Sequence, residues 1–244
     1  MFNYRDVFKR YEIKYLINGA QYEAVRKAME AYMIGDSFGR NTICNIYMET
    51  PEYLLIRRSI DRPVYKEKLR LRSYGLATPD SRVFLELKKK YESIVYKRRV
   101  HMTEQEAEAF LLHGDRVESK SRRENQILNE IAYTMDHYGD LQPAVFLSYD
   151  REAFYCKDDS DVRLTFDENI LWRDYDISLC SGIYGTSILD RNQVLMEIKT
   201  GTSIPLWLTE ILSKNRIYKT TFSKYGNAYK AIYNMKQRKD DKYA

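Results

Sequence analysis

The chain has 244 residues, enough for one large domain or two small ones with a real core. Hydrophobic residues make up 44% and charged residues 31%, with 10 glycines and 5 prolines, which excludes a largely disordered or low-complexity chain. The formal net charge is +5, but Arg57 to Arg99 holds 14 Lys and Arg against 5 Asp and Glu, so this segment carries +9 and the rest −4. Such a concentration indicates an anionic partner at one place.

Cysteine usage and the N-terminal sequence indicate a cytoplasmic protein. Cys44, Cys156 and Cys180 are odd in number and have no metal-ligand spacing, as is usual for thiols in a reducing compartment. The first residues, Met-Phe-Asn-Tyr-Arg-Asp, are too polar for a signal peptide. No apolar run approaches the roughly 20 residues of a membrane-spanning helix. We therefore expect a protein that is not itself in the membrane.

Apolar periodicity and turn signals predict strands and helices along the whole chain. Strands are expected over residues 7–17, 41–48, 66–72, 83–90, 94–100, 144–155, 162–167 and 193–200. Helices are expected over residues 19–33, 103–112, 125–138, 205–212 and 223–235. The segment 54–60 is ambiguous, and the charged tail 236–244 is expected to fray.

The strand that begins at Lys66 has two unlike faces. Lys66, Lys68, Arg70 and Arg72 occupy alternate positions, so they project to one side of the strand. Four cations on one face repel one another unless an anion lies across them. This face is either a solvated outer surface or the wall of an anion-binding site.

Most of the expected strands have one apolar and one charged face. We predict an α+β fold, in which about eight antiparallel strands form a closed β-barrel with flanking helices and a charged tunnel. The interior of such a barrel holds only side chains and one slim ligand. Charged faces that point inward must be paired or must hold a counter-ion, and a long polyanion would satisfy that requirement.

Five short motifs occur in order along these strands and the last helix. They are Glu12-Ile13-Lys14-Tyr15, Lys68-Leu69-Arg70-Leu71-Arg72-Ser73-Tyr74-Gly75, Glu86-Leu87-Lys88, Met196-Glu197-Ile198-Lys199 and Phe222-Ser223-Lys224-Tyr225. With these motifs the chain resembles the polyphosphate-polymerase catalytic domain of the vacuolar transporter chaperone (VTC) family, in its compact bacterial form. That family belongs to the triphosphate tunnel metalloenzymes, which are CYTH-like. The resemblance runs from about Phe8 to Tyr233 and implies one tunnel domain over residues 1–244.

The resemblance implies an enzyme that transfers the terminal phosphate of ATP to a growing inorganic polyphosphate chain, with Mn²⁺ or Mg²⁺ bound. The implied partners are ATP, polyphosphate and pyrophosphate. The implied phosphate-contacting catalytic residues are Lys14, Arg70, Arg72, Lys88 and Lys224. The implied substrate-binding residues are Arg57, Lys97, Arg151, Arg163 and Lys199, and the implied metal ligands are Glu197 and Glu12.

Four of these assignments stay open. Arg151 and Arg163 would either line the tunnel or form ion pairs on its outer wall. Glu12 would either bind metal or neutralise neighbouring cations. The register of Arg57 against the family is open because of a length difference.

Two positions depart from the family pattern. The wider superfamily has ExExK on the first strand, but here Arg10 stands in place of the first glutamate, which resembles the polymerases more than the hydrolases. Thr221 stands where yeast-type polymerases have a lysine, and Lys219 is the candidate replacement. The chain is also expected to lack the SPX sensor domain and membrane segments of eukaryotic relatives, so a membrane partner would be a separate protein.

Other functions fit the same residues. A tunnel triphosphatase would hydrolyse inorganic or nucleoside triphosphate in the same fold, although the few acidic residues favour transfer. A non-catalytic module would bind polyphosphate or another polyanion. Nucleic acid is the weakest candidate, because aromatic residues are not interleaved with the cations in a stacking pattern. The sequence does not define the oligomeric state.

Overall fold

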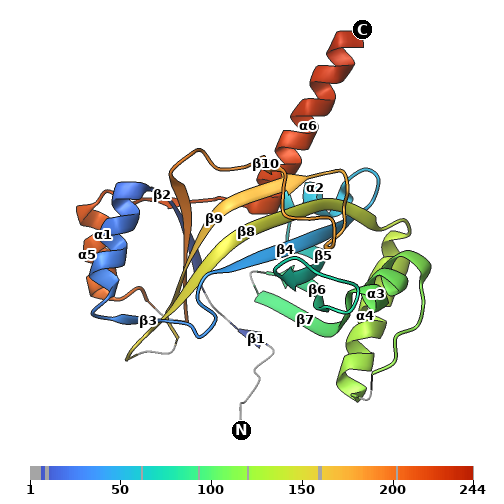
Figure 1. Ribbon diagram of the computed structural model, residues 1–244, viewed down its shortest axis with the longest axis horizontal. Helices are drawn as coiled ribbons and strands as arrows, with labels where there is room; N and C mark the ends of the chain where they lie inside the picture. The colour runs from blue at the N-terminus through green and yellow to red at the C-terminus, as the bar shows by residue number, and fades with distance from the viewer. Residues whose placement is uncertain are drawn as a thin grey trace.

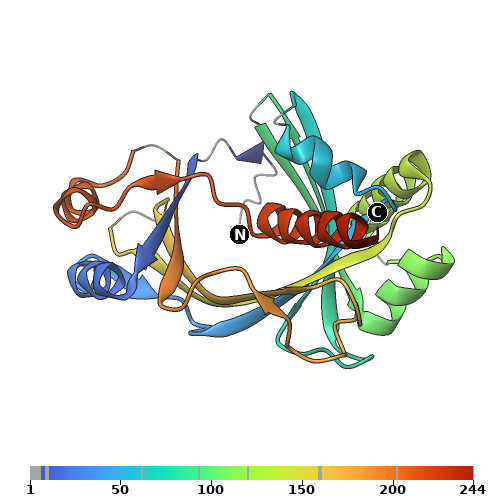
Figure 2. The same cartoon turned by 90° about the horizontal axis from the view of Figure 1, so that it is seen from above.

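A computed structural model describes residues 7–8, 11–61, 63–92, 94–119, 121–158, 161–201 and 203–243. Its main element is one antiparallel sheet of 12 strands, with the strand order β1-β7-β6-β5-β4-β8-β9-β11-β2-β12, to which β3 is added on β8 and β10 on β9. The strands are β1 Val7–Phe8, β2 Tyr11–Asn18, β3 Met33–Gly35, β4 Asn41–Glu49, β5 Tyr65–Tyr74, β6 Arg82–Tyr91, β7 Ile94–Thr103, β8 Gln142–Cys156, β9 Arg163–Arg173, β10 Thr186–Ser187, β11 Gln193–Thr200 and β12 Lys219–Thr220. The sheet is strongly curved (Figures 1 and 2).

The curved sheet confirms the predicted tunnel-type α+β fold, but it is not strictly closed. β1 pairs with β7 near one end of the strand order, and β2 lies near the other end. Among the described residues no ladder joins β12 to β1, so backbone hydrogen bonds do not close the sheet into a barrel. Residues 9 and 10, in the middle of the expected first strand, lie outside the described residues.

Helices pack around this sheet (Figure 1). They are α1 Gly19–Met29, α2 Leu54–Ile60, α3 Glu104–Glu108, α4 Arg122–Tyr138, α5 Leu206–Lys214 and α6 Lys224–Tyr243, with a π-helical turn at Ala109–His113 after α3. The helices α3 and α4 lie against β6 and β7, while α1 and α5 pack together beside β2 (Figure 1). No helix among the described residues is both long enough and apolar enough to cross a bilayer.

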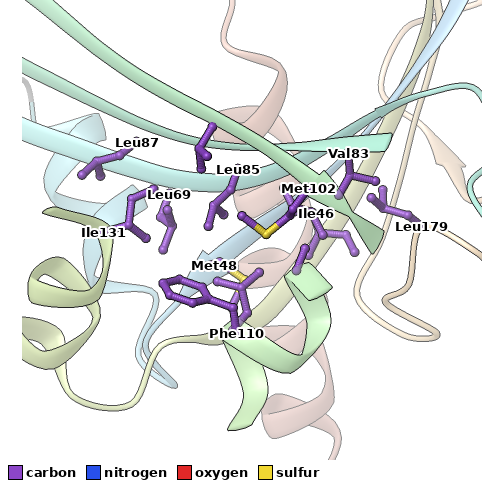
Figure 3. Packing of buried hydrophobic residues seen from close by; sticks show 14 of the residues in the cluster. Ile46, Met48, Leu69, Val83, Leu85, Leu87, Met102, Phe110, Ile131 and Leu179 are labelled. Carbon is purple, nitrogen blue, oxygen red and sulfur yellow. The ribbon is translucent and has the colours of Figure 1, made fainter. Parts of the chain in front are cut away.

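The alternating pattern of the basic strands is confirmed, and it fixes which face points outward. Leu69, Leu85 and Leu87 are fully buried, and together with Ile131 of α4 and Phe110 they form an outer apolar core (Figure 3). Because side chains alternate along a strand, burial of these leucines turns the charged residues between them to the inner face. The hydrophobic effect of the outer core thus orients the cations.

The inner face is filled at one end by the beginning of α6. Tyr225 stacks on Tyr47 of β4 with ring centroids 4.0 Å apart, and Ala228 and Ile232 are buried in the same cluster as Trp172. In Figure 2, α6 lies between the two sides of the curved sheet. The helix therefore closes one end of the lumen with apolar side chains.

Three local expectations need correction or completion. The helix expected to reach residue 33 ends at Met29, and the chain then forms β3 against β8. The ambiguous segment 54–60 is helix α2, whose first amides donate to the buried carboxylate of Glu49 at 2.9 and 2.7 Å. The tail from residue 236 does not fray at once: α6 continues to Tyr243, since residues 236–243 contain no glycine or proline and include good helix formers.

Candidate functional site

Charged residues from several strands face the space that the sheet surrounds, and those on β2, β8, β9 and β11, together with Lys224 of α6, form what we call the carboxylate wall. Its members are Glu12, Lys14, Arg151, Asp167, Glu197, Lys199 and Lys224. The alternation of β11 brings Glu197 to the inner face, because Val194, Met196 and Ile198 belong to an apolar cluster on the other side.

Glu197 is the centre of the carboxylate wall. Its side chain is buried, and one carboxylate oxygen lies 3.0 Å from Nζ of Lys224 and 3.5 Å from Nζ of Lys14. The other oxygen lies 3.5 Å from Arg151 and 3.9 Å from Lys199. Burial opposes the charged carboxylate, but these four cations together hold the pKa of Glu197 well below its usual range. Glu197 is therefore ionised at neutral pH.

Asp167 completes the wall and was not selected from the sequence as a site residue. It has no exposed surface, and it accepts two hydrogen bonds from the guanidinium of Arg151, at 2.5 and 2.6 Å, and an ion pair from Lys224. Burial lowers the pKa of Lys224, but Asp167 and Glu197 outweigh it and raise that pKa to about 12. The sequence does contain a signal for Asp167. It lies four residues after Arg163 in β9, so the two side chains project from the same face of the strand.

The inner faces of β5, β6 and β7 form the second side of the lumen, which we call the basic wall. Its members are Lys68, Arg70, Arg72, Glu86, Lys88, Lys97 and Arg99. Glu86 is its one carboxylate and is 2% exposed. It lies 2.6 Å from Arg70, 2.7 Å from Lys97 and 3.2 Å from Arg99. Burial raises the pKa of Glu86, but Arg70, Arg72 and Lys97 outweigh burial and hold it well below the usual range.

Arg72 is held by neutral partners. Its guanidinium donates to the amide oxygen of Asn45 at 2.9 Å and to the hydroxyl of Tyr149 at 3.2 Å. Arg70 also donates to the hydroxyl of Tyr47, at 3.3 Å, and the neighbouring cations lower the pKa of Tyr47 to about 8 although its burial raises it. These polar side chains on β4 and β8 fix the arginines in place without cancelling their charge.

The two walls lie near each other across the lumen. The amine of Lys88 influences the ionisation of both Glu12 and Lys199, and Lys14 influences that of Lys68. Because β5 and β6 are far from β2 and β11 in the strand order, these interactions cross the lumen. The walls thus surround one space with many more cations than carboxylates.

The structure brings most of the residues predicted from the sequence to these walls, with two exceptions. Arg163 lies at the end of β9, 40% exposed, where it contacts Asp36 at 3.6 Å and the ring of Tyr155. Arg57 is exposed on α2, in a groove of about 590 Å³ between α2 and α6 whose lining includes Tyr229. Neither arginine belongs to the ion-pair network of the two walls. Lys219 is exposed at the edge of the sheet, on β12.

The donor set of the carboxylate wall can be compared with the needs of a divalent metal. Among the described residues no group of three or more His, Cys, Asp or Glu side chains is placed to hold an ion. Glu12 and Glu197 both contact Lys14 and Lys199, so the two carboxylates belong to one cluster. A magnesium-type site often needs only one or two carboxylates when phosphate oxygens supply the rest. The residues fit a metal that arrives with phosphate, and they do not form a metal cage of their own.

Solved structures of other proteins share this fold. A putative adenylate cyclase from Bacillus halodurans superposes with a TM-score of 0.54 at 14% identity, covering 90% of this chain and 96% of the other. A putative adenylyl cyclase from Hippeastrum, described as having a dominant triphosphatase activity, superposes with a TM-score of 0.52 at 18% identity, covering 88% and 92%. At such low identity the likeness concerns the fold alone.

The family itself is defined by sequence. The family model of the VTC domain matches residues 9–233, which is nearly the whole chain. The protein therefore belongs to the VTC domain family, as the motifs of the strands and of α6 indicated. A comparison with curated proteins found no match.

Proposed function

We propose that the protein is a polyphosphate polymerase that transfers the terminal phosphate of ATP to an inorganic polyphosphate chain inside the lumen. The observation that carries the proposal is the charge of the lumen. Cations outnumber carboxylates, and the carboxylates at its centre, Glu86, Asp167 and Glu197, are each contacted by two or more cations. Such a site suits a ligand that brings several negative charges of its own.

The state of these carboxylates favours transfer to phosphate over hydrolysis. A water nucleophile needs a base to take its proton, but Glu86 and Glu197 have pKa values held well below the usual range. A phosphate acceptor is already ionised and needs no strong base. In the proposed step, an oxygen of the terminal acceptor phosphate forms a bond to the γ-phosphorus of ATP while the bond from that phosphorus to the β–γ bridging oxygen breaks. ADP leaves, and the chain grows by one phosphate.

The protein's contribution to this step is positioning and charge neutralisation, as is general for phosphoryl transfer. Arg72, fixed by Asn45 and Tyr149, can offer its remaining donors to phosphate oxygens. Lys14 and Lys224 would bind as point charges at the carboxylate wall. Glu12 and Glu197 would hold Mn²⁺ or Mg²⁺ together with phosphate oxygens, and the metal would supply further neutralisation of the triphosphate.

A product assay tests the proposal. Purified protein is incubated with ATP and Mn²⁺, and the products are resolved on a denaturing gel stained for polyphosphate. We expect a ladder of polymer lengths. Free phosphate without polymer would contradict the proposal in favour of a triphosphatase, the activity described for the Hippeastrum protein. Tight binding of polyphosphate without either product would indicate a non-catalytic module.

Two neighbouring lysines of β6 provide a matched pair for this assay. Lys88 is on the inner face, whereas Lys89 is on the outer face, 3.7 Å from Glu67. We expect Lys88→Ala to lower polymer formation by about 100-fold, the usual cost of removing a donor from a transition-state site. Lys89→Ala should retain wild-type activity, and circular dichroism should report the same fold for both. Full activity in Lys88→Ala would show that the reaction does not take place in the lumen.

A further inference from the structure

Two neighbouring rows of side chains cross the inner face of the basic wall in register. In the first row Arg70 lies opposite Glu86 on β6, and Glu86 lies opposite Arg99 on β7. The signs therefore alternate, and the carboxylate is within 3.2 Å of both guanidinium groups. This row is balanced by the protein's own residues, as buried charges require.

The second row consists of lysines only. Lys68 lies opposite Lys88, and Lys88 lies opposite Lys97. Lys97 reaches Glu86 of the first row at 2.7 Å, but neither Lys68 nor Lys88 has an ion-pair partner among the described residues. Like charges directly opposite each other destabilise a sheet. The pair is therefore an unfavourable arrangement unless an anion joins the two amines.

One carboxylate, Glu49 at the end of β4, interacts with Lys68 electrostatically, but it forms no ion pair with it in the described part of the chain and already accepts hydrogen bonds from two amides of α2 and from the hydroxyl of Tyr225. The amine of Lys68 faces Tyr47 of β4 and the ring of Tyr225 of α6, whose centroid is 5.6 Å away, and its cationic neighbours are Lys66, Lys88 and Lys14. Burial, together with these three lysines, lowers the pKa of Lys68 to about 8. An amine in such a place gains more from a bound anion than a lysine that already has a carboxylate.

We propose that Lys68 and Lys88 form the binding site of the acceptor phosphate chain, which they hold without metal on the side of the lumen opposite Glu197. The inference rests on the proposed function and adds a division of the lumen into two subsites. It also assigns a binding role to Lys68.

The division follows from what each wall offers to a phosphate chain. The carboxylate wall contains Glu12, Asp167 and Glu197, which repel a bare polyanion but suit a triphosphate that carries a metal ion. The lysine pair offers amines that form no ion pair with any carboxylate among the described residues, which suits a metal-free chain. Donor and acceptor can then occupy the same lumen without competing for the same cations.

Binding of inorganic tripolyphosphate in the presence of EDTA tests the subsite without turnover. We expect Lys68→Met, which keeps the length of the side chain and removes its charge, to weaken this binding by about 10-fold or more, because a charge-assisted hydrogen bond is lost. In the polymerase assay the KM for a polyphosphate primer should rise by a similar factor. The KM for ATP should change by less than about 3-fold.

The thermal stability of the ligand-free protein distinguishes a binding lysine from a structural one. Removal of a lysine that only stabilises the fold would lower the unfolding temperature. Without ligand, Lys68→Met should unfold at a higher temperature than the wild type, because the repulsion between the facing amines is relieved. Added tripolyphosphate should then stabilise the wild type more than the variant. Lys89→Met is the matched control on the outer face and should leave tripolyphosphate affinity unchanged.

The outcomes separate this inference from the proposed function. Unchanged tripolyphosphate affinity in Lys68→Met would overturn the subsite, even if the wild type makes polymer. A KM for ATP that rises as much as the KM for primer would place Lys68 at the donor and overturn the division. A wild type that binds tripolyphosphate through Lys68 but makes no polymer from ATP would support the anion site and contradict the polymerase.

Discussion

On the carboxylate wall two fully or nearly buried acids, Asp167 and Glu197, are held by Lys14, Arg151 and Lys224 and are balanced from several elements. On the basic wall a single buried acid, Glu86, forms ion pairs with three cations, and the lysine pair beside it forms none within the described ranges. The charges of the carboxylate wall are nearly balanced by the protein's own side chains. The basic wall has an excess of positive charge that a bound anion would compensate. We therefore expect an incoming anion to gain most binding energy at the basic wall.

The largest effect is expected at the centre of the balanced wall. Glu197→Gln removes one carboxylate from four cations, which leaves buried charge uncompensated and should lower the free energy of unfolding by about 3 kcal/mol. It should also raise the metal concentration needed for activity, because a carboxylate ligand is lost. Chemical denaturation and a metal titration of polymer formation check both expectations. Unchanged metal dependence would remove Glu197 from the metal site.

The same substitution on the basic wall sharpens the comparison. Glu86→Gln should lower the free energy of unfolding by about 2 kcal/mol, because Lys97 and Arg99 are partly exposed and water can compensate them. Unlike Glu197→Gln, this variant should bind tripolyphosphate more tightly than the wild type, since the released cations become available to it. Weaker binding would show that Arg70 must be held by Glu86 in order to act.

The pH dependence of the stability difference between the wild type and Glu86→Gln provides a control. Because the pKa of Glu86 is lowered in the folded protein, its stabilising contribution is complete above the unfolded value of about 4.3 and is lost as pH falls through the folded value. The gap in stability between wild type and Glu86→Gln should therefore shrink as pH falls below about 4. A constant gap would assign the loss to packing and not to charge.

The sequence alone predicted which residues face the lumen in those strands that have one apolar face. The alternation of Leu69 and Leu87 with cations placed Arg70, Arg72 and Lys88 on one side, and burial of the leucines in the outer core confirmed it. Such a local pattern is sufficient because a one-residue shift would expose every leucine. The resemblance to the VTC family, carried by these strands, is confirmed as well.

What depends on partners from distant strands could not be predicted. The pairing of Asp167 with Arg151 and Lys224 joins β9, β8 and α6, and no local spacing reports it. The same is true of Lys68, which carries the same charge as Arg70 on the same face but lies opposite Lys88 of β6 and not opposite a carboxylate of that strand. The register of β5 against β6 decides that difference, and register is a property of the assembled sheet.

The smallest effect is expected at Arg57, which the resemblance placed among the substrate-binding residues. It is exposed on α2 near Tyr229 and belongs to neither wall. Because an exposed arginine without a buried partner contributes little, Arg57→Ala should change the free energy of unfolding by less than about 0.5 kcal/mol. Polymer formation and tripolyphosphate binding should stay within about 2-fold of the wild type, since no donor of either wall is lost. A loss comparable to that of Lys88→Ala would extend the phosphate path from the lumen to the groove between α2 and α6, and the two-wall division would then be too narrow.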